Sequence, residues 1–452
     1  MALSPTLIRK YNLPVPRYTS YPTVPLWDNQ IDLASWEKTV KIAFDQFGKD
    51  EGISLYIHLP FCENLCTYCG CNKRITKNHK VEDPYIEAVL REWEHYLGVL
   101  GEAPKISGIH LGGGTPTFFA PESLELLISK ILKSAERTKN FEFSFEGHPN
   151  NTTFEHLQEL AILGFDRVSY GIQDFDEKVQ KAIHRIQPFE KVKEATENAR
   201  KLGYTSVNFD LIYGLPHQTL QTLENTFQKV AELRPERIAF YSYAHLPSAF
   251  PAQKSFEEFL PKEEEKRALY EFGKAKLIEM GYEEIGMDHF ALPEDPLCLA
   301  KQNETLHRNF MGYTTLPTKM LIGLGASSIS DVWIGFAQNE KRIEAYEDVM
   351  KEHHIALVKG HLLTDEDLLV RELILDLICK GKAMVPFSIW ENIPAKNKQA
   401  LKEFEEEGLL SLSDLQLTIH PDGMAVVRNI CSNFDLRMIQ SQEKKAVFSK
   451  AI

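Results

Sequence analysis

Four cysteines lie within ten residues of one another, at Cys62, Cys66, Cys69 and Cys71. Thiolates are soft donors that suit zinc or an iron–sulfur cluster. The first three have the spacing C-x3-C-x2-C on one loop, which is able to hold three corners of a cubane cluster and leave its fourth iron open to a ligand. A structural zinc site on all four cysteines is the alternative, but such sites usually pair C-x2-C units that lie far apart. The loop therefore favours an iron–sulfur centre with catalytic chemistry.

Charge and composition restrict the kind of protein that carries this loop. The chain has 452 residues, of which 43% are hydrophobic and 25% charged, as in an ordinary globular protein. Its 51 Lys and Arg against 64 Asp and Glu give a net charge of −13, which disfavours nucleic acid as a partner. Without a signal peptide or a run of about eighteen apolar residues, we expect a cytoplasmic protein that spans no membrane. We expect the remaining cysteines to be buried thiols: Cys298, Cys379 and Cys431.

The elements that must position the loop are predicted to be six short strands, at residues 54–59, 106–111, 141–145, 167–172, 206–212 and 237–243. Helical patterns separate them, and one helix is predicted to begin at a capping box of Thr152 and Glu155. This alternation predicts a parallel sheet with right-handed crossovers. The predicted fold class is α/β, a partial (β/α)6 open barrel. Polar residues follow the predicted strands, where barrel enzymes carry their chemistry: His58, the 112–115 loop, Glu146, Gln173, Asp210 and His245.

A chain of this length is expected to form two or three folding units. The alternating pattern ends near residue 260, and a glycine-, histidine- and aromatic-rich stretch follows. The last part of the chain combines helical patterns with one hairpin at residues 409–419. We therefore predict four segments: an N-terminal arm at 1–45, the barrel at 46–260, a barrel extension and active-site cover at 261–364, and a small, mostly helical, winged-helix-like domain at 365–452.

The cysteine spacing C-x3-C-x2-C resembles the signature of the radical S-adenosylmethionine enzymes. Cys71, which follows the third cysteine of the signature, makes the loop similar to that of the oxygen-independent coproporphyrinogen III oxidase (dehydrogenase) family. The resemblance covers nearly the whole chain. It includes further separate segments, at residues 16–23, 112–117, 171–175, 210–216, 243–247, 286–290, 307–315 and 337–339.

The resemblance implies an enzyme that decarboxylates two propionates of coproporphyrinogen III to vinyl groups, giving protoporphyrinogen IX. The implied cofactors are a [4Fe-4S] cluster and two molecules of S-adenosylmethionine, one of which yields a 5′-deoxyadenosyl radical. We also expect a monomeric protein that depends on a flavodoxin- or ferredoxin-type reductant and on an unknown electron acceptor. A radical S-adenosylmethionine methyltransferase and a haem chaperone of the same superfamily are the alternatives; Cys71 and the 16–23 segment disfavour the chaperone.

The resemblance also implies the roles of individual residues. Cys62, Cys66 and Cys69 would hold the cluster. One S-adenosylmethionine, bound to the cluster, would contact Tyr56, Gly113, Glu146, Ala244 and Ile329. A second would contact Tyr68, Gly114, Thr115, Gln173, Arg185 and Asp210. The residues closest to catalysis would be Tyr56, Cys71 and Arg17.

Taken singly, several of these residues have a structural alternative. The glycine run could be a tight turn, Glu146 a solvated carboxylate and Arg185 a surface cation, while Gln173 and Asp210 could make structural hydrogen bonds. The chain also departs from the family pattern Glu-x-Asp-Pro-Arg, because His148 and Asn150 replace the acid and the arginine. Any contact of the missing arginine is therefore in question.

An anionic tetrapyrrole needs local cations in so acidic a chain. The candidates are Arg17, Lys73, Arg74 and Arg308, and the sequence does not choose among them. The 16–23 segment holds two tyrosines and two prolines, so it is stiff and amphipathic. We interpret it as a lid over the ligand mouth, the alternative being a structural plug.

Overall fold

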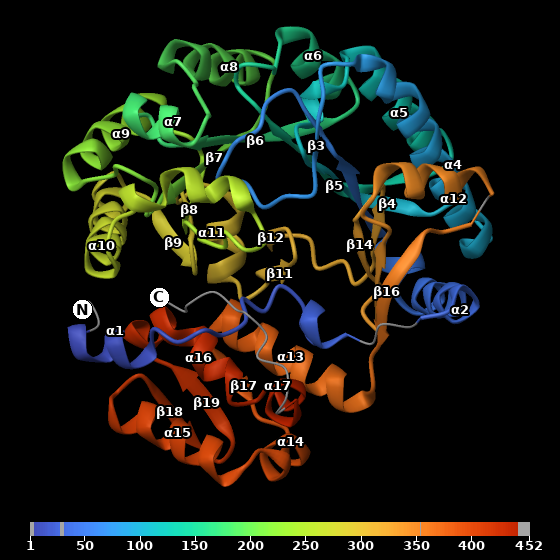
Figure 1. The fold of residues 1–452 in the computed structure, drawn as a ribbon. Coiled ribbons are helices and arrows are strands. Elements are labelled where there is room, and N and C mark those ends of the chain that lie inside the picture. Colours follow the sequence, from blue (N-terminus) through green and yellow to red (C-terminus); the bar gives the residue numbers. More distant parts are fainter. Residues whose placement is uncertain (1–3, 28–30, 353, 442–452) are drawn as a thin grey trace.

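The structure is a computed structural model that describes residues 4–27, 31–352 and 354–441. Six parallel strands pair in sequence order and curve into an open barrel (Figure 1). Their positions confirm the predicted strands and the (β/α)6 fold class. They are β1 (Ile53–Leu59), β4 (Lys105–Gly113), β5 (Glu136–Gly147), β6 (Phe165–Gln173), β7 (Ser206–Tyr213) and β8 (Arg237–Ser242).

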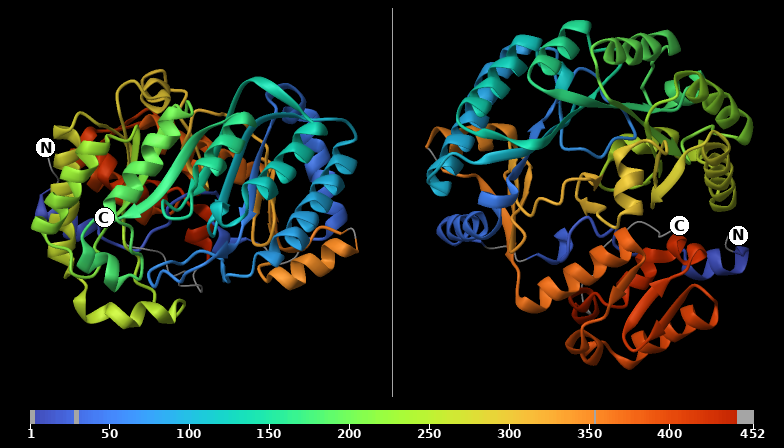
Figure 2. Two further views of the ribbon diagram at one scale, coloured as in Figure 1. Left: turned by 90° about the horizontal axis from the view of Figure 1, so that it is seen from above. Right: turned by 180° about the vertical axis from the view of Figure 1, so that it is seen from behind.

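Helices cover the outside of this sheet, as the view from behind in Figure 2 shows. They are α4 (Glu82–Leu100), α5 (Pro121–Lys133), α6 (Phe154–Ile162), α7 (Glu177–Ala182), α8 (Phe189–Lys201), α9 (Leu220–Leu233) and α10 (Glu263–Glu279). The predicted capping box of α6 is wrong by one residue. Thr153 caps this helix with His156 as its partner, while the Thr152 hydroxyl contacts Thr117 and the carbonyl of His148. Both threonines fit the cap chemically, and only the tertiary contacts of Thr152 decide between them.

Short strands extend both edges of the barrel sheet. At one edge, β13 (Leu321–Leu324) pairs in parallel with β1, and three antiparallel strands follow: β14 (Ile329–Asp331), β15 (Gly335–Asn339) and β16 (Leu357–Leu362). At the other edge lie β10 (His289–Ala291) and β9 (Glu283–Gly286). A separate hairpin joins β11 (His307–Asn309) to β12 (Gly312–Thr314). Strands of three or four residues are too short for a clear alternating pattern, which is why the sequence left this region irregular.

The C-terminal region packs around its own hydrophobic cluster. It contains α13 (Asp365–Lys380), α14 (Phe387–Asn392), α15 (Ala395–Glu406), α16 (Val427–Ser432) and α17 (Leu436–Gln440). A small sheet joins β17 (Lys382–Met384), β19 (Gln416–Ile419) and β18 (Leu410–Ser413), and its last two strands form the predicted hairpin. The boundaries of the four segments themselves stay a prediction.

The N-terminal arm runs between the barrel and the C-terminal region (Figure 1). It begins with α1 (Pro5–Tyr11), and Tyr18 and Tyr21 are buried in the hydrophobic cluster of the C-terminal region. The lid interpretation is therefore wrong for these two tyrosines, because apolar burial against α13 and α17 outweighs exposure at a ligand mouth. Arg17, which precedes Tyr18, does line a large cavity.

The remaining short helices connect these parts. They are α2 (Leu33–Ala43), α3 (Lys49–Glu51), α11 (Pro296–Gln302), α12 (Ile343–Lys351), a π-helical turn at Phe44–Gly48, and 3-10 turns at Val24–Leu26, His79–Val81, Pro116–Phe118, Pro251–Phe259 and Pro421–Val426. Two further short strands, β2 (Phe61–Cys62) and β3 (Arg74–Ile75), pair across the base of the cysteine loop. No helix in the described part of the chain has the length and apolar character that crossing a membrane requires.

Candidate active site

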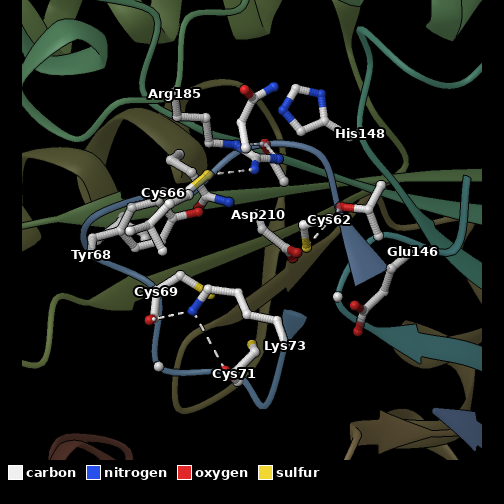
Figure 3. Close-up of a pocket in the computed structure, with 18 of the residues that line it drawn as sticks. Cys62, Cys66, Tyr68, Cys69, Cys71, Lys73, Glu146, His148, Arg185 and Asp210 are labelled. Atoms are coloured by element: carbon white, nitrogen blue, oxygen red, sulfur yellow. Dashed lines mark hydrogen bonds between the residues drawn. The ribbon is translucent and has the colours of Figure 1, made fainter. Parts of the chain in front are cut away.

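A large cavity of about 1170 Å³ opens at the carboxyl ends of the barrel strands. The cysteine loop forms one side of it, and the ends of β4, β5, β6, β7 and β8 form the rest. Figure 3 shows the labelled side chains turned into this space from the loop and from the strand ends. The parallel arrangement brings these residues together, because all six strands end at the same rim.

The cysteine loop is anchored on three sides. The pairing of β2 with β3 closes its base. The backbone N–H of Thr67 donates to the carbonyl of Ile183 at 3.1 Å. The buried amide of Gln253 donates to the carbonyls of Tyr68 at 3.0 Å and of Ala244 at 3.3 Å, so it joins the loop to the end of β8. These contacts fix the direction of the thiols before any ligand binds.

Hydrogen-bond donors and cations lie next to the thiols. The Thr115 hydroxyl donates to Cys62 Sγ at 3.4 Å, and Arg185 Nη1 donates to Cys66 Sγ at 3.4 Å (Figure 3). A hydrogen bond from Cys71 lowers the pKa of Cys69 to about 5, with Lys73 nearby and with burial acting in the opposite direction. Burial raises the pKa of Cys62 to about 11. Because the thiolate is the form that binds metal, positive charge at Cys66 and Cys69 prepares the loop for a metal centre.

The donor set fits a cubane cluster better than a single zinc ion. All four loop cysteines are free thiols, and all line the same cavity. Within the described residues, no three His, Cys, Asp or Glu side chains converge on one point as a mononuclear metal requires. In a cubane each thiolate binds a different iron, so the sulfurs spread around the cluster instead of meeting at one ion.

The glycine run at the end of β4 passes unusually close to the loop. A Cβ at Gly114 would lie 2.7 to 2.8 Å from backbone atoms of Pro60 and Phe61. Gly113 has a φ of 115°, and a Cβ there would meet the ring of His58 at 2.7 Å. Only glycine therefore fits at both positions. A simple turn would not need this, whereas a close approach of the backbone to other groups does.

Glu146, at the end of β5, faces the cavity next to this run. Its Oε2 accepts from the backbone N–H of Gly113 at 3.3 Å, and its Oε1 lies 3.5 Å from Nε2 of His110. Although burial acts against ionisation, the hydrogen bond from His110 lowers the pKa of Glu146. The side chain keeps 46% of its surface accessible. It is therefore a carboxylate with free acceptor capacity for the hydroxyl or ammonium groups of a ligand.

Three further residues form a second polar group, from the ends of β6 and β7 and from the loop after α7. Arg185 is held by the carbonyl of Gly171, at 2.9 Å from Nε and 2.7 Å from Nη2. Gln173 has a φ of 66°, which is costly for a residue other than glycine and is typical of functional positions. Asp210 accepts from Asn208 at 2.8 Å and from Ser169 at 3.3 Å. Burial, with the Glu146 carboxylate nearby, raises the pKa of Asp210 to about 6.

The structure brings most of the predicted site residues to one cavity. The lining includes Arg17, Cys62, Cys66, Tyr68, Cys69, Cys71, Gly113, Gly114, Thr115, Glu146, Gln173, Arg185, Asp210 and Ala244. Tyr56 and Ile329 are outside this lining. The hydroxyl of Tyr56 lies 3.1 Å from Nδ1 of His58, and its ring stacks on His110 beside Glu146. Ile329 is half-buried on β14, at the sheet edge beyond β1.

Sequence reasoning gave no functional role to Gln253, His148 or Asn150, which also line the cavity. Gln253 lies on a 3-10 turn outside the motifs, and only its long-range contacts reveal it. His148, which replaces the acid of the family pattern, lies beside Arg185 (Figure 3). Burial and the Arg185 charge hold the pKa of His148 well below its usual range, so it adds a neutral ring. Asn150 donates to the carbonyl of Ile186 at 2.9 Å and so fixes the loop that carries Arg185.

Known proteins match this chain over nearly its full length. The model of the radical SAM superfamily matches residues 56–230. The oxygen-independent coproporphyrinogen III oxidase of Synechocystis is 37% identical, covering 99% of this chain and 98% of the relative, and that of Escherichia coli is 35% identical with the same coverage. A solved structure of coproporphyrinogen III oxidase from Escherichia coli, described as a radical SAM enzyme, superposes with a TM-score of 0.88 at 34% identity, covering 96% of this chain and 99% of that one.

Proposed function

The chain belongs to the family of oxygen-independent coproporphyrinogen III oxidases within the radical SAM superfamily, and from this membership we propose how its residues carry the reaction. The enzyme decarboxylates two propionates of coproporphyrinogen III oxidatively to vinyl groups, which gives protoporphyrinogen IX. It uses a [4Fe-4S] cluster and S-adenosylmethionine. The observation that carries the residue assignments is the set of three thiols on one anchored loop, facing a cavity lined by Gly113, Glu146 and Asp210.

In this proposal Cys62, Cys66 and Cys69 hold the cluster. When bound, the cluster supplies the electron that cleaves S-adenosylmethionine to a 5′-deoxyadenosyl radical. Arg185 and Lys73 lie beside the loop and compensate the negative charge of the thiolates. The exposed Cys71 stays available to the substrate side of the cavity. The chain's own task is to orient the ligands and to exclude water from a reactive intermediate.

Two molecules of S-adenosylmethionine are proposed to share the cavity, whose volume of about 1170 Å³ supports more than one ligand. Glu146, the N–H groups of the glycine run and Ala244 serve the molecule at the cluster, and Tyr56 and Ile329 support that side from behind. Arg185, Gln173 and Asp210 serve the second molecule, together with Tyr68, Gly114 and Thr115. A guanidinium suits a ligand carboxylate, and Asp210 suits hydroxyl or ammonium donors.

The proposal extends to the oligomeric state, the cellular location and the redox partners of the enzyme. We infer a monomeric, cytoplasmic enzyme that receives electrons from a flavodoxin- or ferredoxin-type protein and passes substrate electrons to an acceptor that the sequence does not identify. All seven cysteines are free, which supports a reducing compartment. Sedimentation of the purified holoenzyme tests the monomer.

An anaerobic assay with reduced coproporphyrinogen III and S-adenosylmethionine tests the function. The product should be lighter than the substrate by two molecules of carbon dioxide and four hydrogen atoms, and 5′-deoxyadenosine should accumulate. A product that gains a methyl group instead would assign the chain to a methyltransferase. Tight haem binding without any turnover would assign it to a haem chaperone.

A further inference from the structure

Arg308 is a buried cation whose charge no described residue neutralises. It lies on β11, with 7% of its surface exposed, and its guanidinium is 4.6 Å from the ring centroid of Tyr313 across the hairpin. Its Nε and Nη1 atoms have no hydrogen-bond partner among the described residues. Leaving such donors unsatisfied in a protein interior is costly, so a buried group of this kind usually has a ligand or a water as partner.

The neighbouring polar atoms are unsatisfied as well. His289 Nδ1 and the Tyr313 hydroxyl also lack a hydrogen-bond partner within the described residues. Both side chains line a second cavity of about 220 Å³ inside the barrel. Glu146, Ser169 and Asp210 line this cavity and the large one alike, so the two spaces meet at those residues. Two unsatisfied polar side chains therefore belong to residues of the inner cavity, and the Arg308 guanidinium packs on the ring of one of them, Tyr313.

Two further arginines lie near Arg308. Arg17, from the arm, acts electrostatically on His289 together with Arg308, and both of these arginines act on Arg428 of α16. Asp288 is an acid of this set, and it forms an ion pair with Arg17. Arg428 donates to the carbonyls of Pro16 and Val15. Three arginines are thus gathered near Tyr313, together with the carboxylates of Asp288 and Glu284.

The other candidate cations have their own partners. Arg74 pairs with Glu344 at the surface, where both side chains are largely exposed. Lys73 donates to the carbonyl of Cys69 at 2.9 Å and so belongs to the cysteine loop. Arg17 is paired with Asp288. The structure therefore distinguishes Arg308 from the other three cations, which the sequence did not.

We propose that Arg308, with His289 and Tyr313, forms an anion subsite that binds a propionate carboxylate of the tetrapyrrole. A guanidinium offers several N–H donors to a carboxylate, the Tyr313 hydroxyl is a further donor, and the neutral imidazole of His289 donates from whichever nitrogen carries its proton. This subsite rests on the proposed function, since it takes the tetrapyrrole as the ligand of the cavity.

Equilibrium binding of coproporphyrin III, the fluorescent oxidised analogue, tests the subsite on the reconstituted holoenzyme. Arg308→Gln should weaken binding roughly 10- to 100-fold, as expected when a charged hydrogen-bond partner is lost. Arg308→Lys should recover part of this loss, because the charge remains. Arg74→Gln, the matched control at the surface, should bind like the unmodified enzyme.

Tyr313→Phe keeps the ring and removes only the unpartnered hydroxyl, so it decides the matter if Arg308→Gln fails to fold. It should weaken coproporphyrin binding a few-fold. Unchanged binding in Tyr313→Phe together with unchanged binding or misfolding in Arg308→Gln would overturn the subsite. Cleavage of S-adenosylmethionine without substrate should stay intact in every variant. Its absence in the unmodified enzyme would instead contradict the proposed function.

Discussion

The strand-end pocket and the arginine subsite differ in how the chain builds them. The pocket takes its residues from the ends of successive strands, each at a short, fixed distance after a regular element. The subsite takes Arg308 from a hairpin, His289 from the sheet edge and its neighbouring charges from the two ends of the described chain. The pocket is therefore encoded locally, whereas the subsite exists only after the arm, the barrel and the C-terminal region have packed together.

The two regions also differ in how their cations are satisfied. Arg185 in the pocket has the carbonyl of Gly171 and the thiol of Cys66 as partners. Arg308 in the subsite has the face of Tyr313, while two of its nitrogens lack partners within the described residues. A cation that already has hydrogen-bond partners is held in a fixed position for a cofactor. A cation without such partners can still form hydrogen bonds to a ligand that binds later. The predictions below test this division.

The largest effect is expected at the cysteine loop. Cys66→Ala removes one of the three proposed ligands, so the iron content and the absorbance of the cluster should be lost, and cleavage of S-adenosylmethionine with them. Cys71→Ala should keep the cluster and lose turnover, because its thiol is assigned to the substrate side. Equal loss of iron in both variants would contradict the assignment and would bring back a site on all four cysteines.

Removal of residues 1–23 should come next, and its main effect should fall on the C-terminal region, against which the arm packs. Tyr18 and Tyr21 are almost fully buried, and the ring of Tyr11 stacks on Phe404 at 4.4 Å. Loss of such aromatic packing costs about 3 kcal/mol or more for each ring, so the melting temperature should fall sharply. We expect the cluster absorbance to survive, because the barrel has its own hydrophobic core. A truncated protein with an unchanged melting temperature and no decarboxylation would restore the lid.

The difference between features encoded locally and features formed by long-range contacts also explains what the sequence could predict. The six barrel strands follow from patterns that span fewer than about ten residues, and the cavity-lining residues of the motifs were implied by the resemblance to the family. The short strands β13 to β16, the hydrogen bonds of Gln253 and the orphan atoms of Arg308 depend on segments that meet only in the fold. The 16–23 segment was misread for this reason. Its tyrosines have the chemistry of a lid, and only the presence of α13 and α17 beside them makes them core residues.

A smaller effect is expected from Arg185→Ala. The guanidinium is assigned to the carboxylate of the second S-adenosylmethionine, and loss of a charged hydrogen bond weakens binding by about 1.5–3 kcal/mol. Equilibrium binding should fall from a stoichiometry of about two towards one, while reductive cleavage at the cluster continues. Lys191→Ala, on the exposed side of α8 and outside the cavity, is the matched control. A stoichiometry of one in the unmodified enzyme would contradict the two-molecule assignment.

The smallest effect concerns the protonation of Asp210. Burial and the Glu146 charge raise the pKa of Asp210 to about 6, so the carboxylate is mostly ionised at pH 7 and mostly protonated at pH 5. The ionised form accepts stronger hydrogen bonds from ligand donors. Affinity for the second S-adenosylmethionine should therefore fall about tenfold between pH 7 and pH 5, as the proton must first be removed.

Asp210→Asn separates this titration from the others. The variant should bind the second S-adenosylmethionine more weakly at pH 7 and should lack the change between pH 7 and pH 5. Glu146 is not expected to cause the change in affinity between pH 7 and pH 5. Although burial acts in the opposite direction, the hydrogen bond from His110 lowers the pKa of Glu146. An identical pH dependence in Asp210→Asn would assign the titration to another group. Coproporphyrin binding at the arginine subsite should be measured at the same two pH values in both proteins. If Asp210→Asn also changes how coproporphyrin binding depends on pH, the two regions are coupled through the residues that line both cavities.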